Sequence, residues 1–149
     1  MNTPLAELNR TRRPHWMLVD DDQMNLSLMG RLLRHYCEAE VECFRDSQDA
    51  LAAFESAPDA FDLIVTDLQM PGMDGVELCR RMHSVSPPVK ILLATGSGDV
   101  TVESATRAGF CGVLRKPFLV GALLGALEVA TRRQPTHPRN EQVNPFLVG

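Results

Sequence analysis

Polar residues whose side chains could carry chemistry follow four separate apolar runs of this sequence. Three acids come after the first run, another after the third, a threonine after the fourth and a lysine after the fifth; they are Asp20, Asp21, Asp22, Asp67, Thr95 and Lys116. Carboxylates that approach one another repel, and a small hard cation such as Mg²⁺ relieves that repulsion. A nearby hydroxyl and ammonium can hold the oxygens of a phosphoryl group. This combination of residue types favours phosphoryl transfer to a carboxylate.

Each of these residues, taken alone, has an ordinary structural explanation. An acidic triplet is usually solvated or caps a helix, Thr95 could be a turn hydroxyl, and a single lysine such as Lys116 is usually a surface charge. Asp67 could be a nucleophile, a metal ligand or a turn residue, because Pro71 and Gly72 break the chain soon after it. Their shared position, directly after apolar runs, is what favours a common site.

The elements that must position these residues alternate along the chain. Strands are expected at residues 16–19, 41–44, 63–66, 89–94 and 111–114. Helices are expected at residues 23–36, after Ser47 as a cap, after Asp74, at 99–108 and at 118–131. This strict alternation predicts an α/β fold, a doubly wound parallel sheet with helices on both faces. Ligands of such sheets bind beyond the carboxyl ends of the strands, where these polar residues would meet.

The composition of the 149-residue chain, 44% hydrophobic and 23% charged, is ordinary for a folded domain. Residues 1–14 and 133–149 lack a helical or strand period and are expected to be flexible, which leaves 15–132 as the domain. Residues 1–13 and 132–149 together carry a charge of +4, so the total of −4 leaves −8 for the middle of the chain. An acidic domain argues against nucleic acid as a partner and is compatible with cation binding.

The sequence contains no apolar run of membrane-spanning length and does not begin with a secretory signal. We therefore expect a cytoplasmic protein with no membrane partner. Its cysteines, Cys37, Cys43, Cys79 and Cys111, form no CxxC pair and have no histidine at metal-ligand spacing. They are expected to be reduced thiols that are buried or half-buried.

Four motifs carry a family resemblance: VDDD at 19–22, TDLQMPGMDG at 66–75, LLATG at 92–96 and RKPF at 115–118. Together and in this order, they resemble the receiver domain of bacterial two-component response regulators, the CheY-like family, over residues 16–131. The resemblance implies a flavodoxin-like five-stranded sheet of order 2-1-3-4-5. It also implies that Asp67 accepts a phosphoryl group from a sensor histidine kinase or a histidine phosphotransfer protein. Such a domain is not an enzyme in the usual sense, although it catalyses its own phosphorylation and dephosphorylation.

The resemblance also implies a set of Mg²⁺ ligands. Asp21 would bind the ion directly, Asp20 directly or through water, Asp67 through one carboxylate oxygen and Gln69 through its backbone carbonyl. Asp22 lies one place beyond the usual acidic pair of the family. We expect Asp22 to cap the following helix.

The same resemblance implies that Thr95 and Lys116 hold the phosphoryl oxygens. The peptide between Lys116 and Pro117 is expected to be cis, a geometry common only before proline. The family commonly has an aromatic residue three places before the lysine, where this chain has Val113. We therefore expect any change on phosphorylation to involve the loop after Thr95 and the helix at 99–108.

The last predicted helix, at residues 118–131, is apolar around more than one face. Packing on a sheet requires one apolar stripe, so the excess predicts a partner surface or a homodimer. The residues after 131 are too few for a helix-turn-helix or an enzyme domain. Output is therefore expected through contact with a downstream protein target or through onward phosphotransfer.

Two other functions are compatible with parts of the sequence. Haloacid-dehalogenase-type phosphohydrolases have an acid after the first strand and a second acid two residues later, a spacing that Asp20 and Asp22 match. However, Gln23 and Met24 replace the Gly-Thr expected in that family, and no acidic pair follows Lys116. The other alternative is a receiver-like docking module that works without phosphate.

Overall fold

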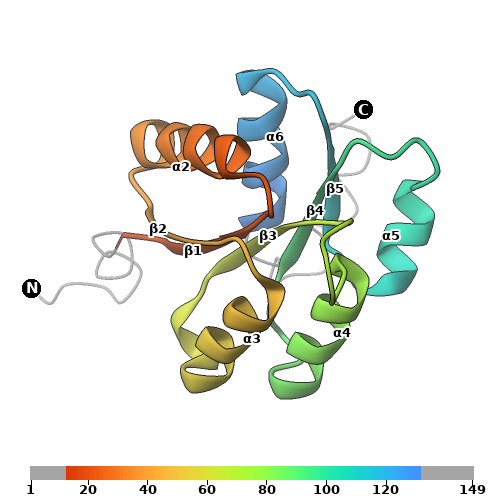
Figure 1. Cartoon of the computed structure of the whole chain (residues 1–149). Coiled ribbons are helices and arrows are strands. Elements are labelled where there is room, and N and C mark those ends of the chain that lie inside the picture. Colours follow the sequence, from red (N-terminus) through yellow and green to blue (C-terminus); the bar gives the residue numbers. More distant parts are fainter. Residues whose placement is uncertain (1–12, 132–149) are drawn as a thin grey trace, which may run out of the picture.

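Residues 13–131, the part of the chain that this computed structural model describes, form a five-stranded sheet between two layers of helices (Figure 1). The strands are β1 His15–Val19, β2 Glu40–Phe44, β3 Leu63–Asp67, β4 Ile91–Thr95 and β5 Gly112–Arg115. All neighbouring strands are parallel, in the order β2-β1-β3-β4-β5. The predicted α/β fold and strand order are confirmed. The segments expected to be flexible, 1–14 and 133–149, lie outside the described residues except for residues 13 and 14.

The helices are divided between the two faces of the sheet (Figure 1). They are α2 Gln23–Cys37, α3 Ser47–Ser56, the short η1 Pro58–Ala60, α4 Gly75–Val85, α5 Val102–Ala108 and α6 Val120–Thr131. One buried cluster joins α3, α4 and α5 to strand residues such as Ile64 and Leu93, and the other joins α2 and α6 to residues such as Leu18 and Val65. Side chains of successive strand residues point to opposite faces, so the central strands are covered on both sides. The strand ends are thereby fixed relative to one another.

Several element boundaries differ from the predicted ones. β3 and β4 each extend one residue further, so Asp67 and Thr95 end strands instead of following them. The helix expected at 99–108 begins only at Val102, because Thr101 caps it in a capping box with Ser104. The last helix begins at residue 120 instead of 118.

The predicted cap of α3 was wrong by one residue. Asp46 has the extended backbone of a cap, and its carboxylate accepts hydrogen bonds from the N–H groups of Gln48 and Asp49. Ser47 is the first helical residue and is buried, and its hydroxyl donates to the carbonyl of Met73 at 2.6 Å. Ser47 therefore ties α3 to the loop that follows β3.

The prediction for the cysteines holds only in part. All four are free thiols; Cys79 is buried and Cys37 half-buried, but Cys43 and Cys111 are exposed. Cys43 lies on β2, which forms an edge of the sheet, and Cys111 lies in the turn before β5. Within residues 13–131, no helix has both the length and the apolar character that crossing a membrane requires.

Candidate functional site

The carboxyl end of the sheet brings the predicted residues together. Asp20 directly follows β1, Asp67 ends β3, Thr95 ends β4 and Lys116 directly follows β5. The Lys116 ammonium donates to Asp20 Oδ2 at 2.8 Å and lies 3.4 Å from Asp67 Oδ1. One cation therefore joins carboxylates from two different strands, as the strand-end rule predicts.

Asp20 is buried and is held by the N-cap residue and the first turn of α2. Its Oδ1 accepts from the Asp22 N–H at 2.9 Å, and its Oδ2 accepts from the Asn25 amide at 3.4 Å. The Asp22 carboxylate accepts from the N–H groups of Met24 and Asn25, which confirms the predicted helix cap. Sequence reasoning missed Asn25, whose only signal was an amide in the first turn of the helix after the acids.

The Asp67 carboxylate is oriented by the backbone around it. Its Oδ1 accepts from the N–H of Leu68 at 2.8 Å. Burial raises the pKa of Asp67, and the charge of Asp20 adds to this increase, while Lys116 and the Leu68 N–H lower the pKa without cancelling it. Burial lowers the pKa of Lys116, but the hydrogen bond and charge of Asp20 and the charge of Asp67 outweigh it, so the net pKa is raised. Lys116 therefore remains an ammonium at neutral pH.

The raised pKa of Asp67 predicts a change in stability when the charge is removed. Because the folded pKa exceeds the unfolded one, the ionised carboxylate destabilises the fold at neutral pH, and protonation on acidification relieves this cost. Asp67→Asn should therefore raise the Tm at pH 7 in the absence of divalent cations, and the difference should shrink as the pH falls through the acidic range. Calorimetry across pH checks this; an equal or lower Tm at pH 7 would contradict it.

Three carboxylates at this site could hold a metal ion. Asp20, Asp21 and Asp67 each offer an oxygen, and the three oxygens lie within 4.8 Å of one another. An all-oxygen, anionic set of this kind fits Mg²⁺, whose ligands at about 2.1 Å lie roughly 3 to 4 Å apart. The Arg45 guanidinium donates twice to the Asp21 carbonyl, at 3.3 and 3.2 Å, and thereby holds the loop that carries two of the acids.

A cleft of about 400 Å³ opens beside these acids. Its lining consists of Asp67, Gln69, Thr95, Gly96, Ser97 and Lys116. Thr95 is buried, and its hydroxyl oxygen accepts from the Ser97 N–H at 3.0 Å. The Lys116-Pro117 peptide is cis, as expected. The cleft thus presents a carboxylate, a hydroxyl and an ammonium to one small space, a combination that suits a phosphoryl group.

Comparison with known proteins identifies the family of this chain. The family model of the response regulator receiver domain matches residues 17–128 of the sequence. The chain belongs to this family. The chain is 34% identical over 134 residues to the transcriptional regulatory protein FixJ of Bradyrhizobium diazoefficiens, and the match covers 89% of this chain and 64% of FixJ. In three further relatives the matched region covers only 16% to 26% of the whole protein, so those proteins contain much that this chain does not match.

Solved structures show the same receiver fold. The crystal structure of FixJ-N is 29% identical, with a TM-score of 0.71, and the match covers 85% of this chain and 99% of FixJ-N. The CheX-CheY-BeF3-Mg²⁺ complex from Borrelia burgdorferi gives a TM-score of 0.79 at 14% identity, covering 85% of this chain and 95% of the solved one. At that identity the likeness concerns the fold alone.

Proposed function

We propose that this receiver domain accepts a phosphoryl group on Asp67 in a Mg²⁺-dependent reaction and signals through protein contact or onward phosphotransfer. The observation that carries the proposal is the contact of Lys116 with both Asp20 and Asp67 at the rim of a cleft that also contains Thr95. Asp20, Asp21, Asp67 and the Gln69 carbonyl would hold Mg²⁺, which supplies positive charge that offsets the repulsion between the acids and the incoming group.

In the reaction, a carboxylate oxygen of Asp67 attacks the phosphorus atom of the donor. The P–N bond of a phosphohistidine breaks, and the imidazole leaves with the bonding electrons and takes a proton from water. Lys116 and the Thr95 hydroxyl hold the phosphoryl oxygens, while the Leu68 N–H keeps the carboxylate in place. The chain contributes positioning and charge, which are the main catalytic factors in phosphoryl transfer. The same groups support the proposal that the domain catalyses its own phosphorylation and, with water as the acceptor, its dephosphorylation.

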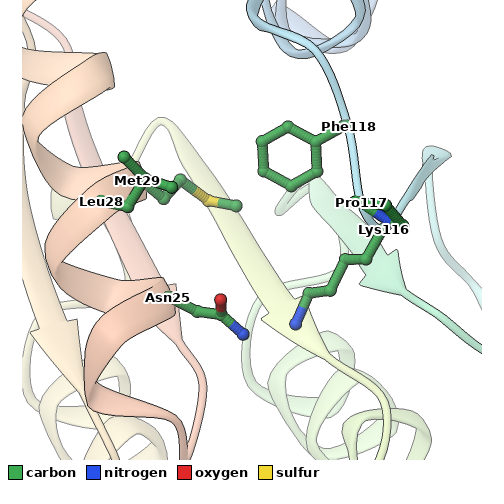
Figure 2. A pocket seen from close by; sticks show the side chains of 6 residues that line it. All are labelled: Asn25, Leu28, Met29, Lys116, Pro117 and Phe118. Carbon is green, nitrogen blue, oxygen red and sulfur yellow. The ribbon is translucent and has the colours of Figure 1, made fainter.

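A second pocket, which Lys116 also lines, supports a protein as the phosphodonor (Figure 2). Its volume is about 340 Å³ and it is lined by Asn25, Leu28, Met29, Lys116, Pro117 and Phe118. In Figure 2 the Met29 and Phe118 side chains face each other across the opening, and Lys116 and Asn25 point toward each other below them. Leu28 and Met24 extend the apolar surface along α2 and are 56% and 80% exposed. A histidine kinase or phosphotransfer protein that binds this apolar rim would place its histidine near the site.

Leu28→Asp should reduce phosphorylation by a protein donor but leave phosphorylation by a small-molecule donor such as acetyl phosphate nearly unchanged. A charge on the apolar rim should reduce phosphotransfer from a histidine-phosphorylated kinase about tenfold, the effect of losing one interface anchor. Labelling by acetyl phosphate should change less than about twofold, because Leu28 lies outside the phosphoryl site. The donor is first found by screening purified phosphorylated kinases with the wild-type domain. Val102→Asp on α5, where Val102 is 63% exposed, is the matched control; equal losses in both variants would contradict this docking surface.

The homodimer through the last helix stays a prediction. Leu123 and Leu127, two of the residues that made this helix look unusually apolar, are buried against the sheet, whereas Val129 is 59% exposed and Leu119, just before the helix, is 82% exposed. The unexplained apolar surface is therefore smaller than expected. A concentration series in light scattering, with and without beryllofluoride, would show whether self-association depends on activation.

Incubation with acetyl phosphate and Mg²⁺, followed by intact-protein mass spectrometry, tests the proposed function. One added phosphoryl group that is absent with a chelator and absent in Asp67→Asn would support it. Turnover of acetyl phosphate that depends on Asp20 and survives in Asp67→Asn would instead support a phosphohydrolase. No labelling under any condition would favour the docking module that works without phosphate.

A further inference from the structure

Arg115 is a charged residue that the proposed mechanism does not use, and it lies immediately before Lys116. It ends β5, where its Cα is paired with that of Thr95 in the β4 to β5 register. The Lys116 N–H donates to the Thr95 carbonyl at 2.9 Å. Backbone pairing between β5 and β4 therefore places Arg115 beside Thr95, whose hydroxyl belongs to the site.

The Arg115 side chain reaches from β5 to the loop that follows β4. Its Nη1 donates to the Ser97 carbonyl at 2.9 Å, and its Nη2 donates to the carbonyl of Val100. A guanidinium presents its donors in a rigid planar fork, so one side chain can bridge two carbonyls that a single ammonium would satisfy less well. The bridge spans the loop between β4 and the cap of α5.

This loop forms one wall of the phosphoryl cleft. Gly96 and Ser97 line the cleft beside Asp67, and the Ser97 N–H donates to the Thr95 hydroxyl oxygen. A hydroxyl that accepts in this way directs its own hydrogen away from Ser97 and keeps it available as a donor. The position of Ser97 therefore determines how well Thr95 is prepared to hold a phosphoryl oxygen.

We infer that Arg115 is a positioning residue that fixes the loop between β4 and α5 and thereby prepares Thr95 and Ser97 for the phosphoryl group. This inference rests on the proposed function and extends it to a residue outside the cleft lining. The acids that would hold Mg²⁺ belong to other loops, so Arg115 should affect the phosphoryl group without affecting the metal.

The test compares Arg115→Met, which keeps the apolar stem but no donors, with Arg115→Lys, which keeps the charge but not the fork. Arg107→Met on α5 is the control, because it removes an exposed arginine from a helix adjoining the loop. In Arg115→Met, beryllofluoride affinity in the presence of Mg²⁺ should fall about 5- to 10-fold, on the order of one charge-assisted hydrogen bond, with Mg²⁺ affinity within about twofold of wild type. Arg115→Lys should lie between Arg115→Met and wild type, and Arg107→Met should match wild type.

Amide hydrogen exchange of residues 96–101 without Mg²⁺ gives a second readout that does not depend on phosphorylation. Exchange should be at least about fivefold faster in Arg115→Met than in wild type. Unchanged exchange, an equal loss of Mg²⁺ affinity, or wild-type behaviour of Arg115→Lys would overturn the inference. A wild-type domain that binds no beryllofluoride would refute the proposed function instead, and the exchange rates would still decide whether Arg115 holds the loop.

Discussion

Lys116→Met should reduce the rate of phosphorylation by acetyl phosphate by about 100-fold or more, the loss expected when a preorganised charged donor is removed from a developing anion. The methionine keeps the length and apolar stem of the side chain and removes only the ammonium. At the same time Mg²⁺ affinity should stay equal or increase, because the ammonium that now pairs with Asp20 and Asp67 no longer competes with the cation. Labelling time courses and Mg²⁺ titrations of the same preparation measure both effects.

Lys90→Met is the matched control for this experiment. Lys90 is the only other lysine of the chain and directly precedes β4, at the opposite end of that strand from Thr95. Its substitution should leave both phosphorylation and Mg²⁺ affinity near wild type. A Lys116→Met variant that loses Mg²⁺ binding together with phosphorylation would indicate general damage to the site and would contradict a specific role for the ammonium.

Gly75→Ala should lower stability by about 2 kcal/mol, within the range measured for overpacking a closely packed position. A Cβ at Gly75 would overlap the backbone carbonyl oxygen of Asp67, and the Gly75 N–H donates to the Leu68 carbonyl at 2.7 Å. The atoms that the new Cβ would meet belong to the backbone at the end of β3, so they cannot move aside as a flexible side chain would. Any shift also displaces Asp67, and a misplaced nucleophile can cost on the order of 100-fold in rate.

Gly125→Ala gives the opposite expectation for stability. Gly125 lies within α6, and a Cβ there would meet no atom within 4 Å apart from its chain neighbours and the backbone of its own helix. Alanine should therefore stabilise the helix by about 0.5 to 1 kcal/mol and leave phosphorylation unchanged. Denaturant unfolding and acetyl phosphate labelling of both variants check the pair; a Gly75→Ala variant as stable and as active as wild type would show that the backbone contact has no consequence.

The meeting of Asp20, Asp67, Thr95 and Lys116 could be predicted from the sequence for one physical reason. Parallel strands that alternate with helices must all end at the same edge of the sheet, so residues that directly follow apolar runs converge there. The strand order could be predicted because the motifs around these residues resemble those of a known family. The cap at Asp22 was predictable as well, because capping depends on local backbone and on one side chain.

The residues that the sequence did not identify act through contacts that the folded backbone creates. Arg115 contacts the loop at 97–100, which lies 15 to 18 residues earlier in the chain. The contacts of Asn25 with Asp20 and of Gly75 with the end of β3 are closer in sequence, but they depend on how the chain turns between the two residues. None of these residue types signals such a contact locally, because each is common on exposed surfaces or in turns. The wrong prediction of Ser47 as a cap has the same origin, because the Ser47 hydroxyl donates to the carbonyl of Met73 in another loop.

Chemical mapping of the phosphorylated residue tests the central proposal most directly. Borohydride reduces an aspartyl phosphate to homoserine with release of phosphate, which leaves a permanent mark on the acceptor residue. After incubation with acetyl phosphate and Mg²⁺, peptide mass spectrometry should find homoserine at position 67 in wild type and no mark when Mg²⁺ is chelated. A mark at Asp20, Asp21 or any other acid, or a mark at position 67 that forms equally well without Mg²⁺, would contradict the proposed site.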